Sequence, residues 1–211
     1  MLWSLSALVI AAGGLAEAWR AIRGPRDSEG YVAFFSLSYE QNLPTYYSSV
    51  LLLLCALLLV LIASGASNSG ERHLWHWHGL ALGFAYMSLD EAVEIHEFAG
   101  GLLQLSGVLY FSWVVPAAVV VIVLALLYIP FLRSLDRRTR MRFLIAGAVY
   151  VAGALLMELP LGYWTEHHGS DSTGYAAIDF VEEALEIIGV SLFLTALADY
   201  VIERGWRFRP T

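Results

Sequence analysis

The segment YYSSVLLLLCALLLVLI, residues 46–62, contains no charged side chain. Its length and polarity approach those of a membrane-spanning helix, which needs ~20 mostly apolar residues. The composition of the whole chain agrees, because 58% of the 211 residues are hydrophobic, only 15% are charged and the mean hydropathy is +0.63. A soluble domain is far more polar than this. The chain is therefore predicted to be a membrane protein.

Further apolar segments of similar length occur on both sides of this one. The predicted spans cover roughly residues 2–19, 46–62, 74–98, 108–129, 143–163 and 176–202. Backbone N–H and C=O groups in hydrocarbon must be bonded internally, which favours helices. We predict an all-α, polytopic membrane protein in which residues 1–211 form a single transmembrane domain, a compact bundle of about six helices.

The arginines predict how this bundle is oriented, because positive charge gathers on the cytoplasmic side. Eight arginines lie between the fourth and fifth spans or after the sixth, at positions 133, 137, 138, 140, 142, 204, 207 and 209. With six spans, both termini are then cytoplasmic. Arg20, Arg23 and Arg26 oppose this orientation but are fewer. All basic residues are arginine, which is typical of a GC-rich bacterium, so we expect the bacterial plasma (inner) membrane.

Residues 88–97, SLDEAVEIHE, place four acids and a histidine within the third predicted span. The pattern DEAVEI of residues 90–95 partly recurs as EEALEI in residues 182–187. Ionisable side chains inside a membrane are costly and mark functional sites. The predicted topology brings both acidic segments, together with Glu158 and Glu17, to the outer half of the bundle.

Helical geometry places these acids in stripes. At about 100° per residue, Asp90, Glu94 and Glu97 fall within an arc of roughly 60°. The stripe of the last span covers roughly 100° and contains Asp179, Glu182, Glu183 and Glu186. Such stripes are expected to face each other, a water-filled cavity or another subunit rather than lipid. His96 lies roughly 160° from Glu94 and does not share the stripe.

Clustered carboxylates with an imidazole are the ligands of dinuclear iron and manganese sites in helical bundles. We therefore expect metal ions, two of Fe or Mn, with Zn or Ca as further alternatives. The predicted ligands are Glu94, His96, Glu97, Glu158, Glu182 and Glu186. Asp90, Asp179 and Glu183 are expected to hydrogen-bond these ligands or to relay protons. The spacing departs from the Glu-x-x-His of ferritin-like sites, and Ile188 stands where the first copy has His96.

The two acidic segments resemble those of uncharacterised bacterial multi-pass membrane proteins that share an LDEAxxIHE helix and a later EExLE helix. Residues 89–97 and 182–186 carry this likeness. The resemblance implies that the two helices form one site. It implies no particular activity.

Three function classes fit these features. The first is a metal-dependent, di-iron-type oxidoreductase acting on a lipophilic substrate that enters from the bilayer. The second is a cation- or proton-coupled transporter, which is disfavoured because residues 50–62, 79–86 and 114–127 offer no charge on the inner side. The third is a non-catalytic accessory subunit of a membrane complex, whose acids bind calcium or other membrane subunits. A zinc hydrolase using Ser88, Asp90 and His96 ranks below these.

Other features carry less information. The single cysteine, Cys55, lies in the second span and excludes an internal disulfide. No basic patch indicates nucleic-acid binding. His76 and His78 are two residues apart, point to opposite sides of a helix and are expected to anchor the chain at the interface. His167 and His168 are expected in a solvated loop.

Overall fold

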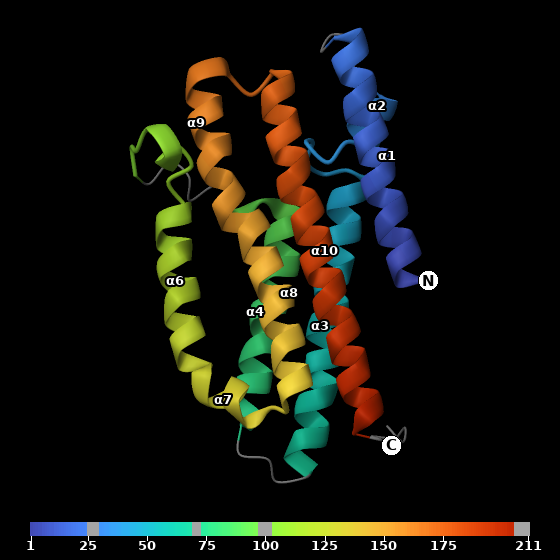
Figure 1. Cartoon of the computed structure of the whole chain (residues 1–211), viewed down its shortest axis with the longest axis vertical. Helices are drawn as coiled ribbons and strands as arrows, with labels where there is room; N and C mark the ends of the chain where they lie inside the picture. The colour runs from blue at the N-terminus through green and yellow to red at the C-terminus, as the bar shows by residue number, and fades with distance from the viewer. Residues whose placement is uncertain (25–29, 69–72, 97–102, 205–211) are drawn as a thin grey trace.

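The computed structural model describes residues 1–24, 30–68, 73–96 and 103–204. This part is mostly helical and contains no strand, which confirms the all-α part of the prediction. In chain order the elements of Figure 1 are α1 (Leu2–Arg23), α2 (Tyr31–Phe35), α3 (Leu43–Asn68), α4 (Leu74–Val93), η2 (Gly107–Leu109), α6 (Val114–Leu127), α7 (Ile129–Ser134), α8 (Arg137–Val151), the π-helical turn η3 (Ala152–Met157), α9 (Glu158–His168) and α10 (Thr173–Glu203).

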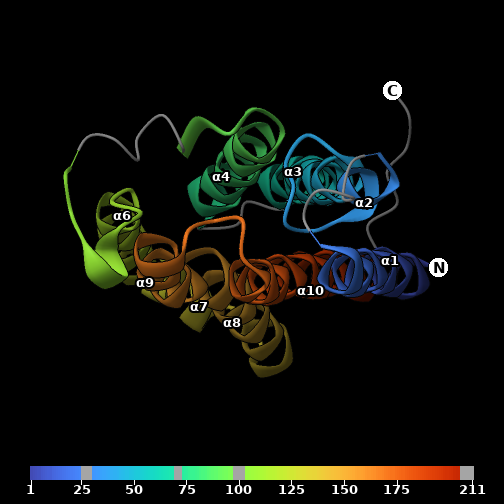
Figure 2. The same cartoon turned by 90° about the horizontal axis from the view of Figure 1, so that it is seen from above.

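The long helices lie alongside one another in two layers (Figure 2). One layer is formed by α3 and α4, and the other by α1, α10, α8, α9 and α6. Helix α10 packs against α8, α3 and α1 and so joins the two layers. Helix α6 stands at one edge and exposes apolar side chains such as Val119, Ile122 and Leu126.

Four helical segments are long and apolar enough to cross a membrane: Leu2–Arg23, Leu43–Ser67, Arg137–His168 and Thr173–Glu203. Two of the six predicted spans do not meet this standard. Helix α4 has 20 residues but includes two histidines and two acids. Helix α6 has only 14 residues, because it ends before α7, whose first turn contains Pro130.

The third predicted span, residues 74–98, is shorter in the structure. Helix α4 ends at Val93, because Glu94 adopts a left-handed conformation with φ 56° and ψ 44°. Its backbone N–H donates to the carbonyl of Asp90 at 2.6 Å, which closes the last turn. A non-glycine residue in this conformation is uncommon. The change of direction takes Glu94 off the face that carries Asp90.

Aromatic rings fill the core at the other end of α4. Phe193 stacks on Phe84 with ring centroids 4.7 Å apart and contacts Phe143 at 4.8 Å. Trp77 contacts Phe131 at 4.7 Å and Tyr200 at 5.1 Å. This half of the bundle is therefore closed by packed apolar groups.

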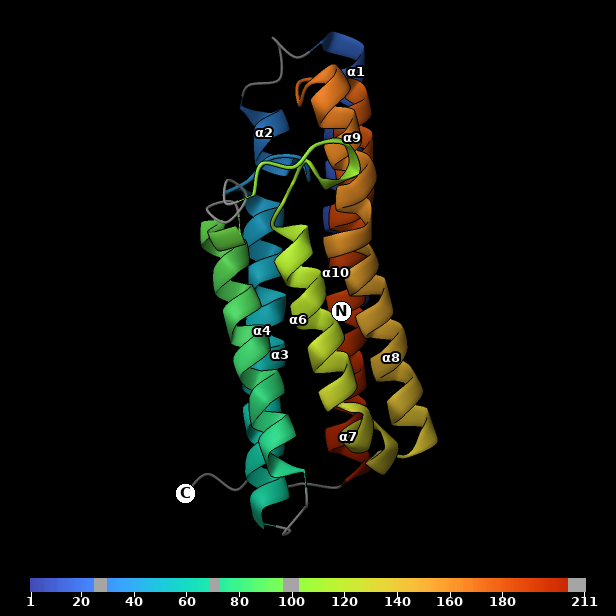
Figure 3. The ribbon, with the colours of Figure 1, turned by 90° about the vertical axis from the view of Figure 1, so that its left-hand side faces the viewer.

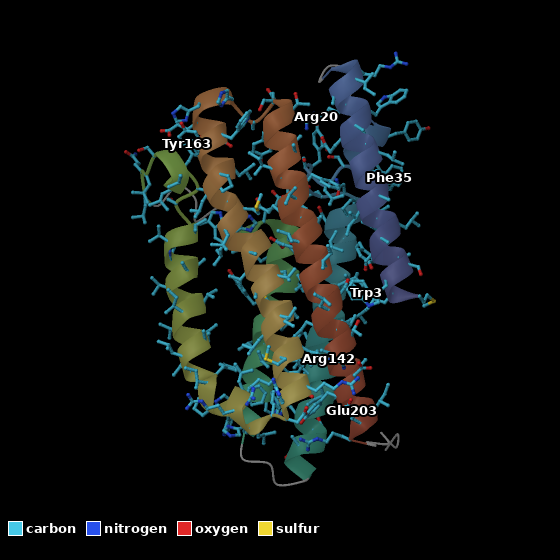
Figure 4. The ribbon with its side chains drawn as sticks, viewed as in Figure 1. Trp3, Arg20, Phe35, Arg142, Tyr163 and Glu203 are labelled. Atoms are coloured by element: carbon cyan, nitrogen blue, oxygen red, sulfur yellow. The ribbon has the colours of Figure 1, made fainter. Side chains whose placement is uncertain are left out.

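Charged side chains lie at both ends of the molecule (Figure 4). Arg142 and Glu203 lie at the lower end of that view, whereas Arg20 and Tyr163 lie at the upper end. At the lower end Arg142 donates to Asp199 at 2.5 Å and Arg138 to Glu203 at 3.1 Å. These ion pairs join α8 to α10 beyond the aromatic core.

Candidate functional site: a carboxylate-lined cavity

A cavity of about 400 Å³ lies between the C-terminal part of α4, the N-terminal half of α10 and the region where η3 meets α9. Carboxyl groups form much of its wall: Glu40, Asp90, Glu91, Glu158, Asp179, Glu182, Glu183 and Glu186. The wall also contains His96 and a group of aromatic residues, namely Tyr110, Phe111, Trp113, Tyr150 and Tyr175. Segments far apart in the sequence therefore contribute to one polar site.

Helix α10 supplies half of these acids from its first four turns. The helix begins after Ser172, whose hydroxyl oxygen accepts a hydrogen bond from the N–H of Tyr175 at 3.2 Å. Residues three and four positions apart then share one face, so Asp179, Glu182 and Glu186 point the same way. Glu182 and Glu186 are only 7% and 8% exposed.

The π-helical turn η3 positions Glu158 opposite this face. A π turn widens a helix locally and is common at functional sites. Gly153 lets this turn approach α10 closely, because a Cβ there would lie 2.8 Å from the carbonyl oxygen of Glu182 and 2.9 Å from Cγ of Glu186. Glu158 directly follows the turn, is 7% exposed and accepts a hydrogen bond from the indole N–H of Trp113 at 3.1 Å.

Asp90 holds His96 at the end of α4. The Oδ1 atom of Asp90 accepts the backbone N–H of His96 at 2.8 Å, and its Oδ2 atom lies 3.0 Å from Nδ1 of the imidazole. The imidazole also packs on Trp113, with ring centroids 4.9 Å apart. With the proton on Nδ1, the Nε2 atom carries the lone pair. A carboxylate that orients a histidine in this way is typical of metal-ligating histidines.

One carboxyl oxygen of Glu182, Oε2, is buried and lacks a hydrogen-bond partner among the described residues. Buried carboxylate oxygens are normally satisfied, because removing them from water without compensation is costly. A cation, a proton or a ligand donor in the cavity would satisfy this atom.

The structure places most of the predicted site residues in the cavity wall. His96, Glu158, Glu182 and Glu186 line it, as do the predicted relay residues Asp90, Asp179 and Glu183. Glu94 does not line it and instead accepts a hydrogen bond from the side-chain amide of Gln41 at 3.0 Å. Glu97 lies outside the described residues.

Two acids of the wall are missed by helical-wheel reasoning. Glu91 lies about 100° from Asp90 on a helical wheel and so falls outside the predicted stripe, yet both residues line the cavity. Glu40 lies in the link before α3, where no helical period exists to indicate its direction. That link is held by the side-chain amide of Asn42, which donates to the carbonyls of Ala33 at 2.9 Å and Ser36 at 2.7 Å.

Glu17 belongs to a neighbouring polar group rather than to the cavity. It accepts a hydrogen bond from the hydroxyl of Ser36 and lies 3.7 Å from the guanidinium of Arg20. Arg20 in turn lies over the ring of Tyr39, 5.3 Å from its centroid. This arginine is therefore occupied by contacts within the bundle.

The donor atoms of the cavity suit a metal ion, but they are spread out. Carboxylate oxygens with one imidazole are ligands that iron, manganese and zinc accept. As the side chains lie, no three His, Cys, Asp or Glu residues of the described ranges converge closely enough to hold an ion. Binding would therefore require changes of side-chain rotamer at the acids of α10 and η3–α9.

Residues 1–200 match the model of a protein family described as "Domain of unknown function (DUF8692)". The chain belongs to this family. The match reaches from α1 into the last turns of α10. The whole cavity wall thus lies within the DUF8692 domain. No curated protein and no solved structure matches the chain.

Proposed function

We propose that this DUF8692 protein is a six-span membrane protein whose cavity binds metal ions, and that the occupied site performs di-iron-type oxidoreductase chemistry on a lipophilic substrate. The observation that carries the metal proposal is the unpartnered Oε2 atom of Glu182, which is buried in a wall of carboxylates. A buried anionic wall of this kind needs cations or protons to offset its self-repulsion.

The arrangement of the helices supports the proposed six spans. Helix α4 and the bent pair α6 and α7 run beside the four long apolar helices (Figure 3). The arginine-rich end with Arg142 (Figure 4) is the proposed cytoplasmic side of the bacterial plasma membrane. The excess of arginine there and an even number of spans would put both termini on that side. The contacts of Arg20 with Glu17 and Tyr39 explain how one opposing arginine is tolerated at the outer end.

The proposed ligands are His96, Glu158, Glu182 and Glu186, with Glu91 as a further carboxylate in reach of the same space. Bound iron or manganese would supply redox and Lewis-acid chemistry. Around it, Asp90 would keep the proton on Nδ1 of His96, so that Nε2 is available.

Two further side chains restrain the proposed carboxylate ligands. Trp113 donates to one oxygen of Glu158 at 3.1 Å. Tyr150 is hydrogen-bonded to Glu186. Each of these bonds restrains the direction of a carboxylate that faces the cavity.

Transport remains the second candidate, and the packing below the cavity argues against it. A transporter needs a polar path to both faces of the membrane. Below the acids, the packed rings of Phe84, Phe193 and Phe143 fill the bundle. We therefore favour a site that opens only towards the outer half.

Metal analysis of the detergent-purified protein tests the proposal. We expect about two iron or manganese ions per chain, as in dinuclear carboxylate sites, with a matching visible spectrum. Glu182→Gln removes the charge in the cavity and should abolish metal binding. Glu94→Gln makes the same change outside the cavity and should retain the metal.

A folded wild-type protein without metal would exclude the proposed function. Equal metal content in Glu182→Gln and wild type would exclude the proposed site. Calcium in place of a redox metal would instead favour the accessory-subunit class.

A further inference from the structure

The cavity is larger than metal ions require. Its volume of about 400 Å³ falls within the range of small-molecule sites, roughly 300 to 1,000 Å³. Two ions with their ligands would occupy only part of this space. The remaining volume can hold an organic molecule, whose chemistry the walls should select.

The charge of the walls favours a cation. Within the described part of the chain, the cavity wall has eight carboxyl groups, one histidine and no arginine. Two divalent ions carry four positive charges, half of what eight ionised carboxylates would carry. The unpartnered Oε2 atom of Glu182, a residue only 7% exposed, is the second sign that a positively charged group belongs in the space.

Aromatic rings lie among these acids at the outer part of the cavity. Tyr175 lies close enough to Asp179, Glu182 and Glu158 to interact with them electrostatically. The indole N–H of Trp113 donates a hydrogen bond to Glu158, and Trp113 also lines the cavity. Carboxylates combined with aromatic faces bind ammonium groups through charge and cation–π attraction.

The aromatic wall is anchored to α9. The backbone N–H of Gly107 donates to Oε2 of Glu166 at 2.6 Å. Gly162 allows close packing, since a Cβ there would lie 3.2 Å from Cβ of Tyr110 and 3.3 Å from Cδ2 of Phe111. A wall that is fixed before binding loses little conformational entropy when a ligand enters.

We propose that the outer part of the cavity, between Trp113, Tyr175, Glu158 and Asp179, binds an organic ammonium group, carried by a free amine or by a membrane lipid. That this ammonium compound is the substrate of the metal-dependent reaction rests on the proposed function. The binding itself follows from the walls alone.

Calorimetric titration of the purified protein in a non-ionic detergent tests the proposal. The probes are choline and its uncharged isostere 3,3-dimethylbutan-1-ol. Choline should bind saturably, and the isostere at least about tenfold more weakly, because it lacks the charge that the carboxylates and rings attract. Absence of choline binding, or equal binding of the two probes, would overturn the proposal.

A pair of variants isolates the aromatic contribution. Trp113→Leu and Trp113→Phe both lose the hydrogen bond to Glu158, but only the second retains an aromatic face. Choline should bind Trp113→Leu roughly 2- to 30-fold more weakly than Trp113→Phe, the range of one cation–π contact. Equal affinity of the two variants would contradict the proposed role of the ring.

Two further measurements are needed. One distinguishes a membrane lipid from a free amine as the carrier of the ammonium group, and the other distinguishes this inference from the proposed metal-dependent function. Tighter binding of dodecyltrimethylammonium than of choline would identify a lipid as the source, and similar binding a free amine. Metal content is measured on the same samples. Metal without choline binding would overturn this inference alone, whereas choline binding without metal would overturn the proposed function alone.

Discussion

Gly153 is the residue at which the backbone of η3 meets the acidic face of α10. A Cβ at this position would lie 2.8 Å from a carbonyl oxygen and 3.2 Å from a backbone nitrogen of α10, and 2.9 Å from Cγ of Glu186. Backbone atoms of a packed helix cannot move aside at low cost. The absence of a side chain at this position therefore sets the distance between Glu158 and the acids of α10.

Replacing Gly153 with alanine should separate the two elements. We expect Gly153→Ala to lower the free energy of unfolding by about 1–3 kcal/mol, as overpacking of a core does, and to weaken metal binding. Gly147→Ala is the control within the same continuous helix, because its Cβ would meet nothing within 4 Å. Unfolding midpoints in detergent would measure the stability of both variants. Equal effects of the two variants would contradict the close approach at Gly153.

At the scale of the elements, the apolar runs predicted where helices lie but not where they end. Helices α3 and α10 coincide with predicted spans, since uncharged or mostly apolar runs specify a helix in a membrane. The end of α4 depends on the left-handed conformation of Glu94, and the π turn of η3 depends on its packing against α10. Neither has a local sequence signal.

The start of α8, unlike the end of α4, has a local sequence signal, the N-cap residue Asp136. Its carboxylate accepts hydrogen bonds from the side-chain hydroxyl of Thr139, from the backbone N–H of Thr139 at 3.0 Å and from that of Arg138 at 2.9 Å. These bonds lower the pKa of Asp136. Because the folded-state pKa is below the unfolded one, this stabilisation is complete above the unfolded pKa and is lost as the pH falls through the folded pKa. Asp136 lies in the link before the Arg137–His168 helix, outside the apolar spans.

We expect Asp136→Ala to lower the free energy of unfolding by about 0.5–2 kcal/mol at neutral pH, the usual value of a helix N-cap. The difference from wild type should shrink as the pH is lowered into the acid range. Asp136→Asn keeps a capping oxygen without a titrating group, so it should retain most of the stability at neutral pH. Denaturation measured against pH would test both. A loss for Asp136→Ala that is independent of pH would contradict the role of the ionised carboxylate.

At the scale of the whole molecule, the alternation of spans predicted which acids would meet. Opposite directions of α4 and α10 place the end of one beside the start of the other, which brings Asp90 and Glu182 into one wall. The alternation of spans did not place Glu40 or the aromatic residues Tyr110 to Trp113 in this wall. Residues 110–113 were predicted within the fourth span, 108–129, but α6 begins only at Val114, so they lie in the link before it, as Glu40 lies in the link before α3. Tertiary contacts determine the course of both links. The sequence therefore predicted the acidic half of the cavity but not its aromatic wall.

The orientation of this bundle gives the last prediction. Asp171, in the turn between α9 and α10, and Ser134, at the end of α7, are both exposed and lie at opposite ends of the bundle. The native Cys55 is 0% exposed, so it should not react with a membrane-impermeant maleimide. With the arginine-rich end cytoplasmic, Asp171→Cys should be labelled in right-side-out membrane vesicles. Ser134→Cys should be labelled only after the membrane is permeabilised. The reverse pattern would invert the proposed orientation and place the cavity on the cytoplasmic side.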